Sequence, residues 1–177
     1  ICEEIGHKQG IGNSYHTIGE IYYKEGNYPE ALKNFFAALK ISEETLVKRL
    51  KNNGVKLEKV PWLKNAYFYK SKFALSSTPE YLQGYYYLQD AASQIPAMIL
   101  DPKPGEIVLD MAAAPGGKTT QMSQMMKNEG VIVALDIKSG RIKSLENNIE
   151  RMGCKNIIVY NKDANYASDL NMKFDKV

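Results

Sequence analysis

Short apolar runs alternate with longer amphipathic segments through the second half of the chain. The apolar runs are residues 107–109, 131–135 and 156–160, and a fourth begins at residue 174. Between them, residues 118–126 and 140–152 carry large apolar side chains every three or four positions, which predicts helices. Strands that alternate with helices form a parallel sheet, so the pattern predicts a doubly wound α/β domain, which we place at residues 79–177.

The segment before the first of these strands also has a helical pattern. We expect a helix from Gln89 to Leu100, bent by Pro96, because proline cannot donate a backbone hydrogen bond. The sequence Asp-Pro-Lys-Pro-Gly at 101–105 predicts a turn that separates this helix from the sheet.

The first 44 residues follow a different pattern. Small and aromatic residues recur at the spacing of a tetratricopeptide repeat, in which two antiparallel helices touch through small side chains. The matching positions are Ile18, Gly19, Tyr22, Gly26, Tyr28, Ala31, Phe35, Ala38 and Leu39. The opening Ile1–Glu4 is repeated in part as Ile41–Glu44, a period of 40 residues. We therefore predict an α-helical tetratricopeptide hairpin at residues 1–44, which offers a surface for a protein partner.

Residues 45–78 are predicted to form a small α/β segment with an RNA-binding character. A helix ends at 52–54, since asparagine and glycine tolerate a left-handed turn, and residues 55–60 and 66–69 are strand-like. Lysines interleave here with aromatic residues, namely Lys56, Lys59, Lys64, Lys70 and Lys72 with Trp62, Tyr67 and Tyr69. This mixture is typical of an RNA-binding surface. It is equally typical of a small aromatic core beneath a solvated lysine face, and both interpretations stay open.

The stretch VLDMAAAPGGKTT, from Val108 to Thr120, joins the first strand of the α/β domain to a helix through small residues and glycines. Such a loop lets a ligand lie against the backbone, and the free N–H groups of the helix start favour a negative group. One interpretation is a phosphate loop, because Gly117–Thr119 ends the pattern G-x-x-x-x-G-K-[ST]; Ala112 stands where its first glycine belongs.

The other interpretation is a pocket for adenosylmethionine, which needs no phosphate cradle. Its ribose requires an acid at the end of the next strand, and Asp136 stands there, 26 residues after Asp110. Both acids also fit ordinary strand-end or helix-cap residues.

The string Leu109–Thr119 resembles the LD-x-CAAPGGKT signature of the Sun-type, RsmB-like RNA 5-methylcytosine methyltransferases, the archaeal tRNA enzymes in particular. Other motifs of this family are matched by Gly84, Gln89, Asp90 and Ser93, by Asp136, Arg141, Asn148, Arg151 and Gly153, and by Asn161–Ala164. The resemblance runs from residue 45 to residue 177. It implies a Rossmann-like methyltransferase sheet, of which this chain holds a part, and S-adenosyl-L-methionine as cofactor. It also implies RNA as the partner, and we expect tRNA rather than rRNA.

The resemblance also implies the residues that bind the methyl donor. The donor-site residues are Ala112, Ala113, Ala114, Pro115, Gly116, Gly117, Lys118, Asp136, Arg141 and Asp163. In this assignment Asp136 accepts the ribose hydroxyls, Asp163 accepts from the adenine amino group, and Lys118 faces the methionine carboxylate.

Methylation of cytosine at carbon 5 needs a cysteine, because thiolate addition at carbon 6 makes carbon 5 nucleophilic. In the family this cysteine lies in a T-C motif, with a D-A-P-C motif beside the base, and both follow a segment like Phe174–Val177. Cys2 and Cys154 match neither motif, so we predict no catalytic residue in this chain. The expectation is an N-terminal fragment that binds the methyl donor and lacks turnover.

Composition narrows the function classes only a little. The net charge of +3 permits nucleic-acid binding without requiring it. The two cysteines have no metal-ligand spacing and no run approaches the ~18 apolar residues of a membrane helix, so we expect a cytoplasmic protein without a metal site or membrane span. A P-loop-like nucleotide-binding protein and a tetratricopeptide scaffold remain as alternative functions.

Overall fold

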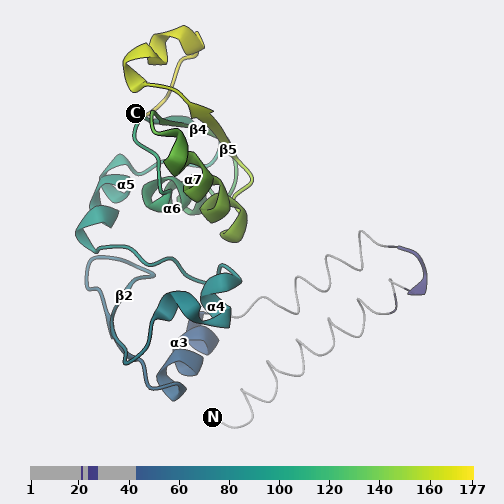
Figure 1. The fold of residues 1–177 in the computed structure, drawn as a ribbon, viewed down its shortest axis with the longest axis vertical. Helices are drawn as coiled ribbons and strands as arrows, with labels where there is room; N and C mark the ends of the chain where they lie inside the picture. The colour runs from purple at the N-terminus through teal and green to yellow at the C-terminus, as the bar shows by residue number, and fades with distance from the viewer. Residues whose placement is uncertain (1–20, 22–23, 28–42) are drawn as a thin grey trace. The chain divides into compact units, whose positions relative to one another are not determined.

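The computed structural model describes residue 21, residues 24–27 and residues 43–177 (Figure 1). The chain divides into two compact units, residues 1–53 and residues 54–177, which are described separately. Most of the predicted tetratricopeptide hairpin lies outside the described residues, so that hairpin and its protein partner stay predictions.

In the first unit the described helix is α3, Glu43–Asn52. Two glutamates stand in its first turn and Arg49 and Lys51 in its last turn, which complements the helix dipole. The helix ends where the sequence predicts, because Asn53 donates its backbone N–H to Arg49 and Gly54 has a φ of +84°.

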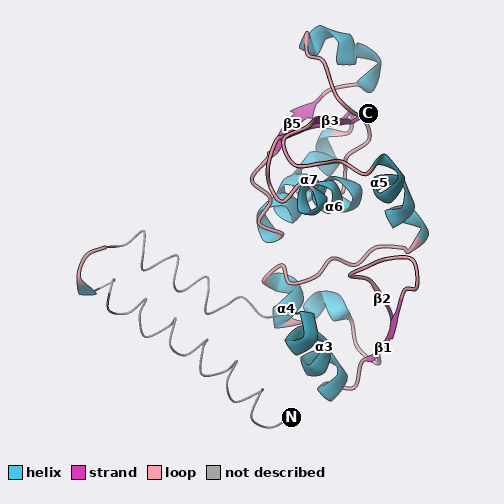
Figure 2. Cartoon of the chain, turned by 180° about the vertical axis from the view of Figure 1, so that it is seen from behind, coloured by secondary structure: helices cyan, strands magenta, loops and turns pink. Residues whose placement is uncertain are grey.

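The second unit begins with a two-stranded antiparallel hairpin, as expected from the two strand-like segments. Strand β1 is Lys56–Lys59 and strand β2 is Tyr67–Lys70. A hydrogen bond from the Val60 N–H to the Ala66 carbonyl, 2.9 Å long, closes the intervening turn. The position of the hairpin in the chain is visible in Figure 2.

The main sheet is parallel and contains β3 (Ile107–Asp110), β4 (Val131–Asp136) and β5 (Ile157–Asn161) in the order β3-β4-β5. Helix α6 (Gly117–Met125) connects β3 to β4, and α7 (Ser139–Arg151) connects β4 to β5. Lys176 pairs with Val108 in a parallel bridge, which adds the start of a fourth strand beside β3. The predicted α/β class and parallel sheet are therefore confirmed.

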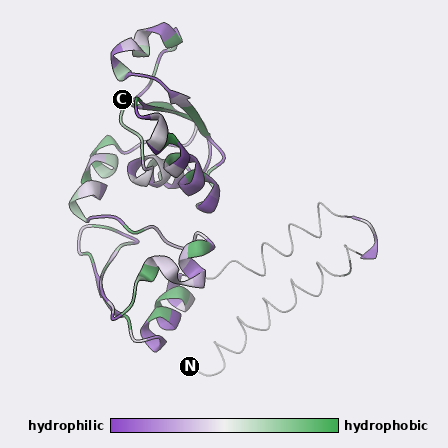
Figure 3. Cartoon of the chain, in the orientation of Figure 1, coloured by the Kyte–Doolittle hydropathy of each residue, from purple (hydrophilic) through white to green (hydrophobic). Residues whose placement is uncertain are grey.

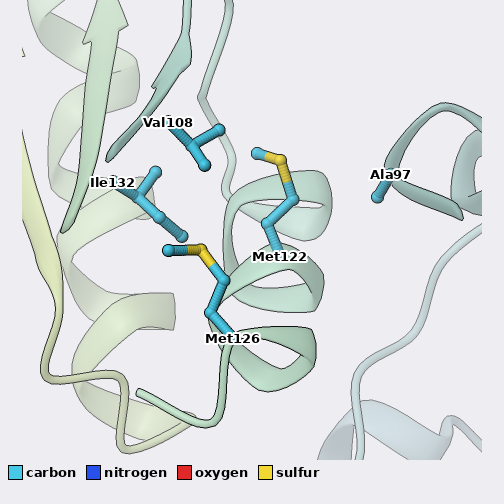
Figure 4. Close-up of a cluster of buried hydrophobic side chains, with 5 residues drawn as sticks. All are labelled: Ala97, Val108, Met122, Met126 and Ile132. Atoms are coloured by element: carbon cyan, nitrogen blue, oxygen red, sulfur yellow. The ribbon is translucent and has the colours of Figure 1, made fainter. Parts of the chain in front are cut away.

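Both long helices cover the same face of this sheet. Met122 of α6 and Met126, the residue that caps this helix, point toward Val108 and Ile132 (Figure 4), and Leu145 of α7 packs with Ala134. Ile132 and Ala134 alternate along β4, so they share a face. The central strand β4 is apolar along most of its length (Figure 3) and packs against hydrophobic clusters on both faces, as expected of a parallel sheet.

The opposite face is covered differently. Leu109, Val133 and Leu135 pack against Leu170 and Phe174. Leu170 ends a 3₁₀ segment, η3, Ala164–Leu170. Within the described residues, this face is therefore packed by a short 3₁₀ segment and by the segment that leads to Lys176 rather than by a long helix.

The chain before β3 is less regular than predicted. It contains short helical pieces, namely η1 (Leu75–Ser77), α4 (Pro79–Leu82), η2 (Ala92–Gln94) and α5 (Ile95–Leu100). The helix expected from Gln89 is wrong in its start and in its bend, because Pro96 stands in the first turn of α5, where its missing N–H costs no hydrogen bond. Asp101, with a φ of +47°, ends this helix.

Candidate functional site

The loop between β3 and α6 is organised around the carboxylate of Asp110. Its Oδ1 accepts a hydrogen bond from the Ala112 N–H at 3.2 Å, and its Oδ2 accepts one from the Thr119 hydroxyl at 2.7 Å. Thr119 is fully buried. Asp110 therefore joins the end of β3 to the first turn of α6 and fixes the start of the loop between them.

Two further contacts hold the loop in place. The Ala113 N–H donates to the Leu135 carbonyl at 2.9 Å, which joins the loop to the end of β4. The Thr120 hydroxyl donates to the Gly116 carbonyl at 2.8 Å. Together with Asp110, these bonds give the loop a defined backbone without any ligand.

The same bonds weigh against a phosphate loop. In that motif the threonine hydroxyl after the lysine contacts a magnesium ion. Here the Thr119 hydroxyl donates to Asp110 and lies 3.3 Å from the Ala113 carbonyl, so it is committed to the loop itself.

Two glycines bring neighbouring segments against the loop. Gly116 has a φ of +109°, and a Cβ there would come 3.0 Å from a methyl group of Leu145. A Cβ on Gly117 would come 3.1 Å from the side chain of Gln89 and 3.2 Å from the ring of Tyr87. Glycine is required at Gly116 by conformation and at Gly117 by the close approach of two side chains.

Asp136 ends β4 directly beside this loop. Its side chain is only 4% exposed, its Oδ2 accepts from the Ala114 N–H at 3.2 Å, and its Oδ1 accepts from the Lys138 N–H at 3.0 Å. The half-exposed guanidinium of Arg141 lies 3.4 Å from Asp136 Oδ2 and also donates to the Ala114 carbonyl. The structure thus brings together three of the predicted donor-site residues, Ala114, Asp136 and Arg141.

Asp163 and Lys118 lie at the same carboxyl edge of the sheet, but Asp163 accepts a hydrogen bond as a helix cap and Lys118 is exposed. Asn161, the last residue of β5, pairs with Asp136, and its side-chain amide donates to the Asp136 carbonyl at 2.8 Å. Asp163 follows two residues later and caps η3 by accepting from the Asn165 N–H. Lys118 is exposed on the first turn of α6. Ligands of parallel α/β sheets bind at this edge.

A second group of residues braces the site, and sequence reasoning gave it no role. The Asn148 amide donates to the Pro115 carbonyl at 2.9 Å, while its Oδ1 accepts from the Arg151 guanidinium at 3.0 Å. Arg151 also donates to the Tyr81 carbonyl at 2.8 Å, and its guanidinium lies 4.0 Å from the centre of the Tyr81 ring. Helix α7 therefore holds both the loop and the segment around Tyr81.

Gly84 completes this brace. A Cβ there would come 1.8 Å from the Arg151 carbonyl oxygen, so only glycine allows the two segments to meet. The signals for Gly84, Asn148 and Arg151 were present in the sequence as matched motif letters. Their function as a brace required the geometry.

Cys154 is the cysteine in the described part of the chain. It follows the end of α7 and lies half-buried. Burial raises the pKa of its thiol, and a hydrogen bond with Ser123 offsets this in part. A nucleophilic cysteine needs the opposite shift, since the thiolate is the reactive form.

Two other site types find no support in the described residues. These residues contain no cluster of three or more histidine, cysteine or acidic side chains able to hold a metal ion. In the same part of the chain, every helix is too short or too polar to cross a bilayer.

Comparison with known proteins decides which family this loop belongs to. Residues 97–177 match the family model of the 16S rRNA methyltransferase RsmB/F, and residues 35–91 match the N-terminal domain of 16S rRNA methyltransferase RsmF. The chain belongs to the RsmB/F family of methyltransferases. The family predicted from the motifs is confirmed, and the RsmF-type N-terminal match identifies the segment around the hairpin.

Relatives of this RsmB/F chain carry names that specify carbon 5 of cytosine in RNA as the atom methylated. The 25S rRNA (cytosine-C(5))-methyltransferase nop2 of Schizosaccharomyces pombe is 38% identical over 185 residues, covering 100% of this chain and 30% of the relative. The tRNA (cytosine(49)-C(5))-methyltransferase of Pyrococcus abyssi is 43% identical, covering 74% of this chain and 43% of the relative. The chain spans less than half the length of either relative.

Solved structures agree with the fold. A methyltransferase homolog protein from Pyrococcus horikoshii superposes with a TM-score of 0.72 at 46% identity, covering 77% of this chain and 45% of that chain. NSun6 from the same organism, solved with the adenosylmethionine analogue SFG, gives a TM-score of 0.56 at 41% identity over 58% of this chain and 27% of that chain.

Proposed function

We propose that this chain binds S-adenosyl-L-methionine at the loop of residues 112–118 and supplies the methyl-donor half of an RNA cytosine-C5 methyltransferase. The observation that carries the proposal is the buried carboxylate of Asp136, joined through the Ala114 N–H to that loop. A rigid loop of small residues next to an acid at a strand end is the arrangement that a nucleoside with a free ribose diol requires.

The residues present fit this cofactor. Gly116 and Gly117 let the side chains of Leu145 and Gln89 pack directly against the loop, which fixes the course of its backbone. Asp136 has four acceptor positions, and the Ala114 N–H, the Lys138 N–H and Arg141 occupy three of them. A ribose diol that donates a hydrogen bond from each of its hydroxyls would need two acceptor positions on Asp136. It would therefore displace the exposed Arg141 guanidinium, which would then lie beside the ligand.

Other predicted residues would bind the rest of the cofactor. Lys118 would neutralise the methionine carboxylate, and Asp163 would accept from the adenine amino group. When bound, adenosylmethionine supplies a methyl group on a sulfonium. The role of this chain is to orient that group at the carboxyl edge of the sheet.

The acceptor side of the reaction needs a thiolate, and we propose that the 177-residue chain does not supply one. Cys154, the one cysteine among the described residues, lies after α7 with a raised thiol pKa. Donor binding without an activated acceptor leaves the barrier nearly unchanged. Turnover would require a segment with a cysteine placed beside the base, supplied in the same chain or added separately.

The proposed substrate is RNA, either tRNA or rRNA, because the relatives are named for both. Our expectation of tRNA remains part of the proposal. The lysine-rich hairpin of residues 55–72 is the part of the second unit suited to an RNA backbone.

Calorimetric titration with adenosylmethionine, and separately with ATP plus magnesium, tests the donor site. We expect binding of the first ligand and none of the second. Asp136→Asn should weaken adenosylmethionine binding by about 1–3 kcal/mol, because one charged acceptor for the ribose is lost. Asp169→Asn is the matched control, since Asp169 pairs with Lys162 on the surface. Binding of ATP alone would overturn the proposal in favour of a P-loop-like protein.

A further inference from the structure

The loop of residues 112–118 is contacted by residues from two different parts of the chain. Residues 35–91 match the RsmF N-terminal domain and residues 97–177 match the RsmB/F methyltransferase, which contains the loop. Tyr87 and Gln89 belong to the first part, yet a Cβ on Gly117 would come 3.2 Å from the Tyr87 ring and 3.1 Å from the Gln89 side chain. The position of residues 81–89 therefore bears directly on the shape of the loop.

Arg151, the last residue of α7, holds that segment. Its Nη1 donates to the Tyr81 carbonyl at 2.8 Å and to the Tyr86 carbonyl at 3.2 Å. Its guanidinium carbon lies 4.0 Å from the centre of the Tyr81 ring and 5.5 Å from the centre of the Tyr87 ring. One guanidinium thus fixes both ends of the segment of residues 81–87.

The Nε–Nη2 edge of the same guanidinium orients Asn148. Nε and Nη2 donate to Asn148 Oδ1 at 3.3 and 3.0 Å. Because the amide oxygen faces Arg151, the amide nitrogen points the other way. That nitrogen donates to the Pro115 carbonyl at 2.9 Å and lies 3.5 Å from the Tyr87 hydroxyl. Arg151 therefore determines the direction in which Asn148 Nδ2 donates.

The two sets of contacts use the planar shape of the guanidinium. Nη1 serves the carbonyls of Tyr81 and Tyr86 while Nε and Nη2 serve Asn148, so the partners are held at fixed relative positions. A lysine in this place would bring the same charge on a single nitrogen, which lacks this fork of N–H groups. The arrangement therefore needs arginine and not only a cation.

We propose that Arg151 is a positioning residue for the methyl donor, which fixes residues 81–87 and the Asn148 amide together and, through them, the turn of residues 115–117. The inference rests on the proposed function, since this turn belongs to the loop proposed to bind adenosylmethionine. Coupling between two sites is reciprocal. If the segment orders the loop, then adenosylmethionine bound at the loop orders the segment.

Calorimetric titration of the 177-residue chain with adenosylmethionine is the first test. Arg151→Met keeps an unbranched side chain but removes every N–H group, and it should weaken binding about fivefold, the effect of one lost hydrogen bond. Arg151→Lys should not restore the affinity, because one nitrogen cannot hold both sets of partners. Lys155→Met is the matched control, since it removes the same charge from an exposed position after α7 and should bind like the parent.

A double variant tests whether Arg151 acts through Asn148. Asn148→Ala and Arg151→Met should together weaken binding by clearly less than the product of the two single effects, because both remove the same contact with the Pro115 carbonyl. Losses that multiply fully would overturn the inference.

Hydrogen exchange separates positioning from a general loss of stability. In Arg151→Met the amides of residues 112–114 should exchange faster by a larger factor than those of β4, Val131–Asp136. In the parent, saturating adenosylmethionine should slow exchange at Gln83, Gly84 and Tyr85, whose amides donate within the segment. This slowing should be absent in Arg151→Met. Equal acceleration of the loop and β4 would overturn the inference.

Failure of the inference and failure of the proposed function give different results. Selectively faster loop exchange in Arg151→Met, with no adenosylmethionine binding by the parent, would refute the proposed function alone. Binding of adenosylmethionine with equal affinity by the parent, Arg151→Met and Lys155→Met would refute the positioning role alone.

Discussion

The side-chain amide of Asn148 donates a 2.9 Å hydrogen bond to the carbonyl of Pro115, so helix α7 holds the loop of residues 112–118 from the side. Asn148 is in turn held by Arg151, which donates to its Oδ1. This pair connects the proposed donor loop to the segment around Tyr81 through a single helix face, since the two residues are three positions apart.

Asn148→Ala should weaken adenosylmethionine binding by about 1 kcal/mol, because the Pro115 carbonyl loses its partner and the loop samples other conformations. Calorimetry measures this effect, and the midpoint of thermal unfolding reports any global loss. Asn147→Ala is the control, since Asn147 precedes Asn148 on the same helix and its side chain is exposed. An equal effect of both substitutions would show that the Pro115 contact does not matter.

Gly84→Ala should lower the free energy of unfolding by about 2–4 kcal/mol. Its φ of +78° disfavours any side chain, and the added Cβ would meet the Arg151 carbonyl oxygen at 1.8 Å. Gly105→Ala separates the two causes, because Gly105 has a φ of +89° with nothing within 4 Å of its added Cβ. Urea titration of both variants should show a clearly larger loss in the free energy of unfolding for Gly84→Ala. Equal losses would mean that only the positive φ, and not the contact with Arg151, disfavours a side chain at Gly84.

The sequence predicted the parallel sheet well because periodicity and strand-end acids are local signals. The strands from Ile107, Val131 and Ile157 appear close to their expected bounds, and Asp136 lies where the ribose acid was expected. The pattern of α7 was equally clear, since Leu145 is fully buried. In each case the decisive interaction involves residues of one element and its direct neighbour.

The brace could not be predicted in the same way. Gly84 and Arg151 are 67 positions apart, and no local pattern indicates that a carbonyl oxygen approaches a glycine. The start of α5 was missed for a related reason, since a proline within a helical pattern fits a bend as well as a first turn. The commitment of Thr119 to Asp110 also appears only in the folded loop.

Thr119→Val should cost about 1–3 kcal/mol of stability and weaken adenosylmethionine binding. The substitution keeps the shape of the side chain but leaves Asp110 Oδ2 without its 2.7 Å hydroxyl partner inside the unit. Thr119→Ser, which keeps the hydroxyl, should recover most of the binding. Thermal unfolding and calorimetry on both variants make the comparison. If Val and Ser behave alike, the Asp110 bond does not shape the loop.

Cys154 should react slowly with iodoacetamide in the folded chain. Burial raises the pKa of its thiol, so at pH 8 the folded protein holds less thiolate than the urea-unfolded protein. Because the folded pKa lies above the unfolded one, this group's contribution to stability is fully present below the unfolded pKa and is lost as the pH rises through the folded pKa. Alkylation is followed by mass spectrometry from pH 7 to 10 in a Cys2→Ser background, so that one thiol is counted.

The same cysteine provides the sharpest check on the proposed absence of turnover. Cys154→Ser should leave adenosylmethionine affinity within about twofold of the parent, because the thiol belongs to the turn after α7 and contacts Ser123 rather than the loop of residues 112–118. Labelled methyl transfer to transcribed tRNA should be absent for the parent and the variant alike, since the described residues of neither protein present a thiolate at the carboxyl edge of the sheet. Adding a segment that carries the family's D-A-P-C and T-C motifs should produce transfer that persists in Cys154→Ser. Transfer by the 177-residue chain alone that disappears in Cys154→Ser would instead make Cys154 the nucleophile and contradict the proposed division of labour.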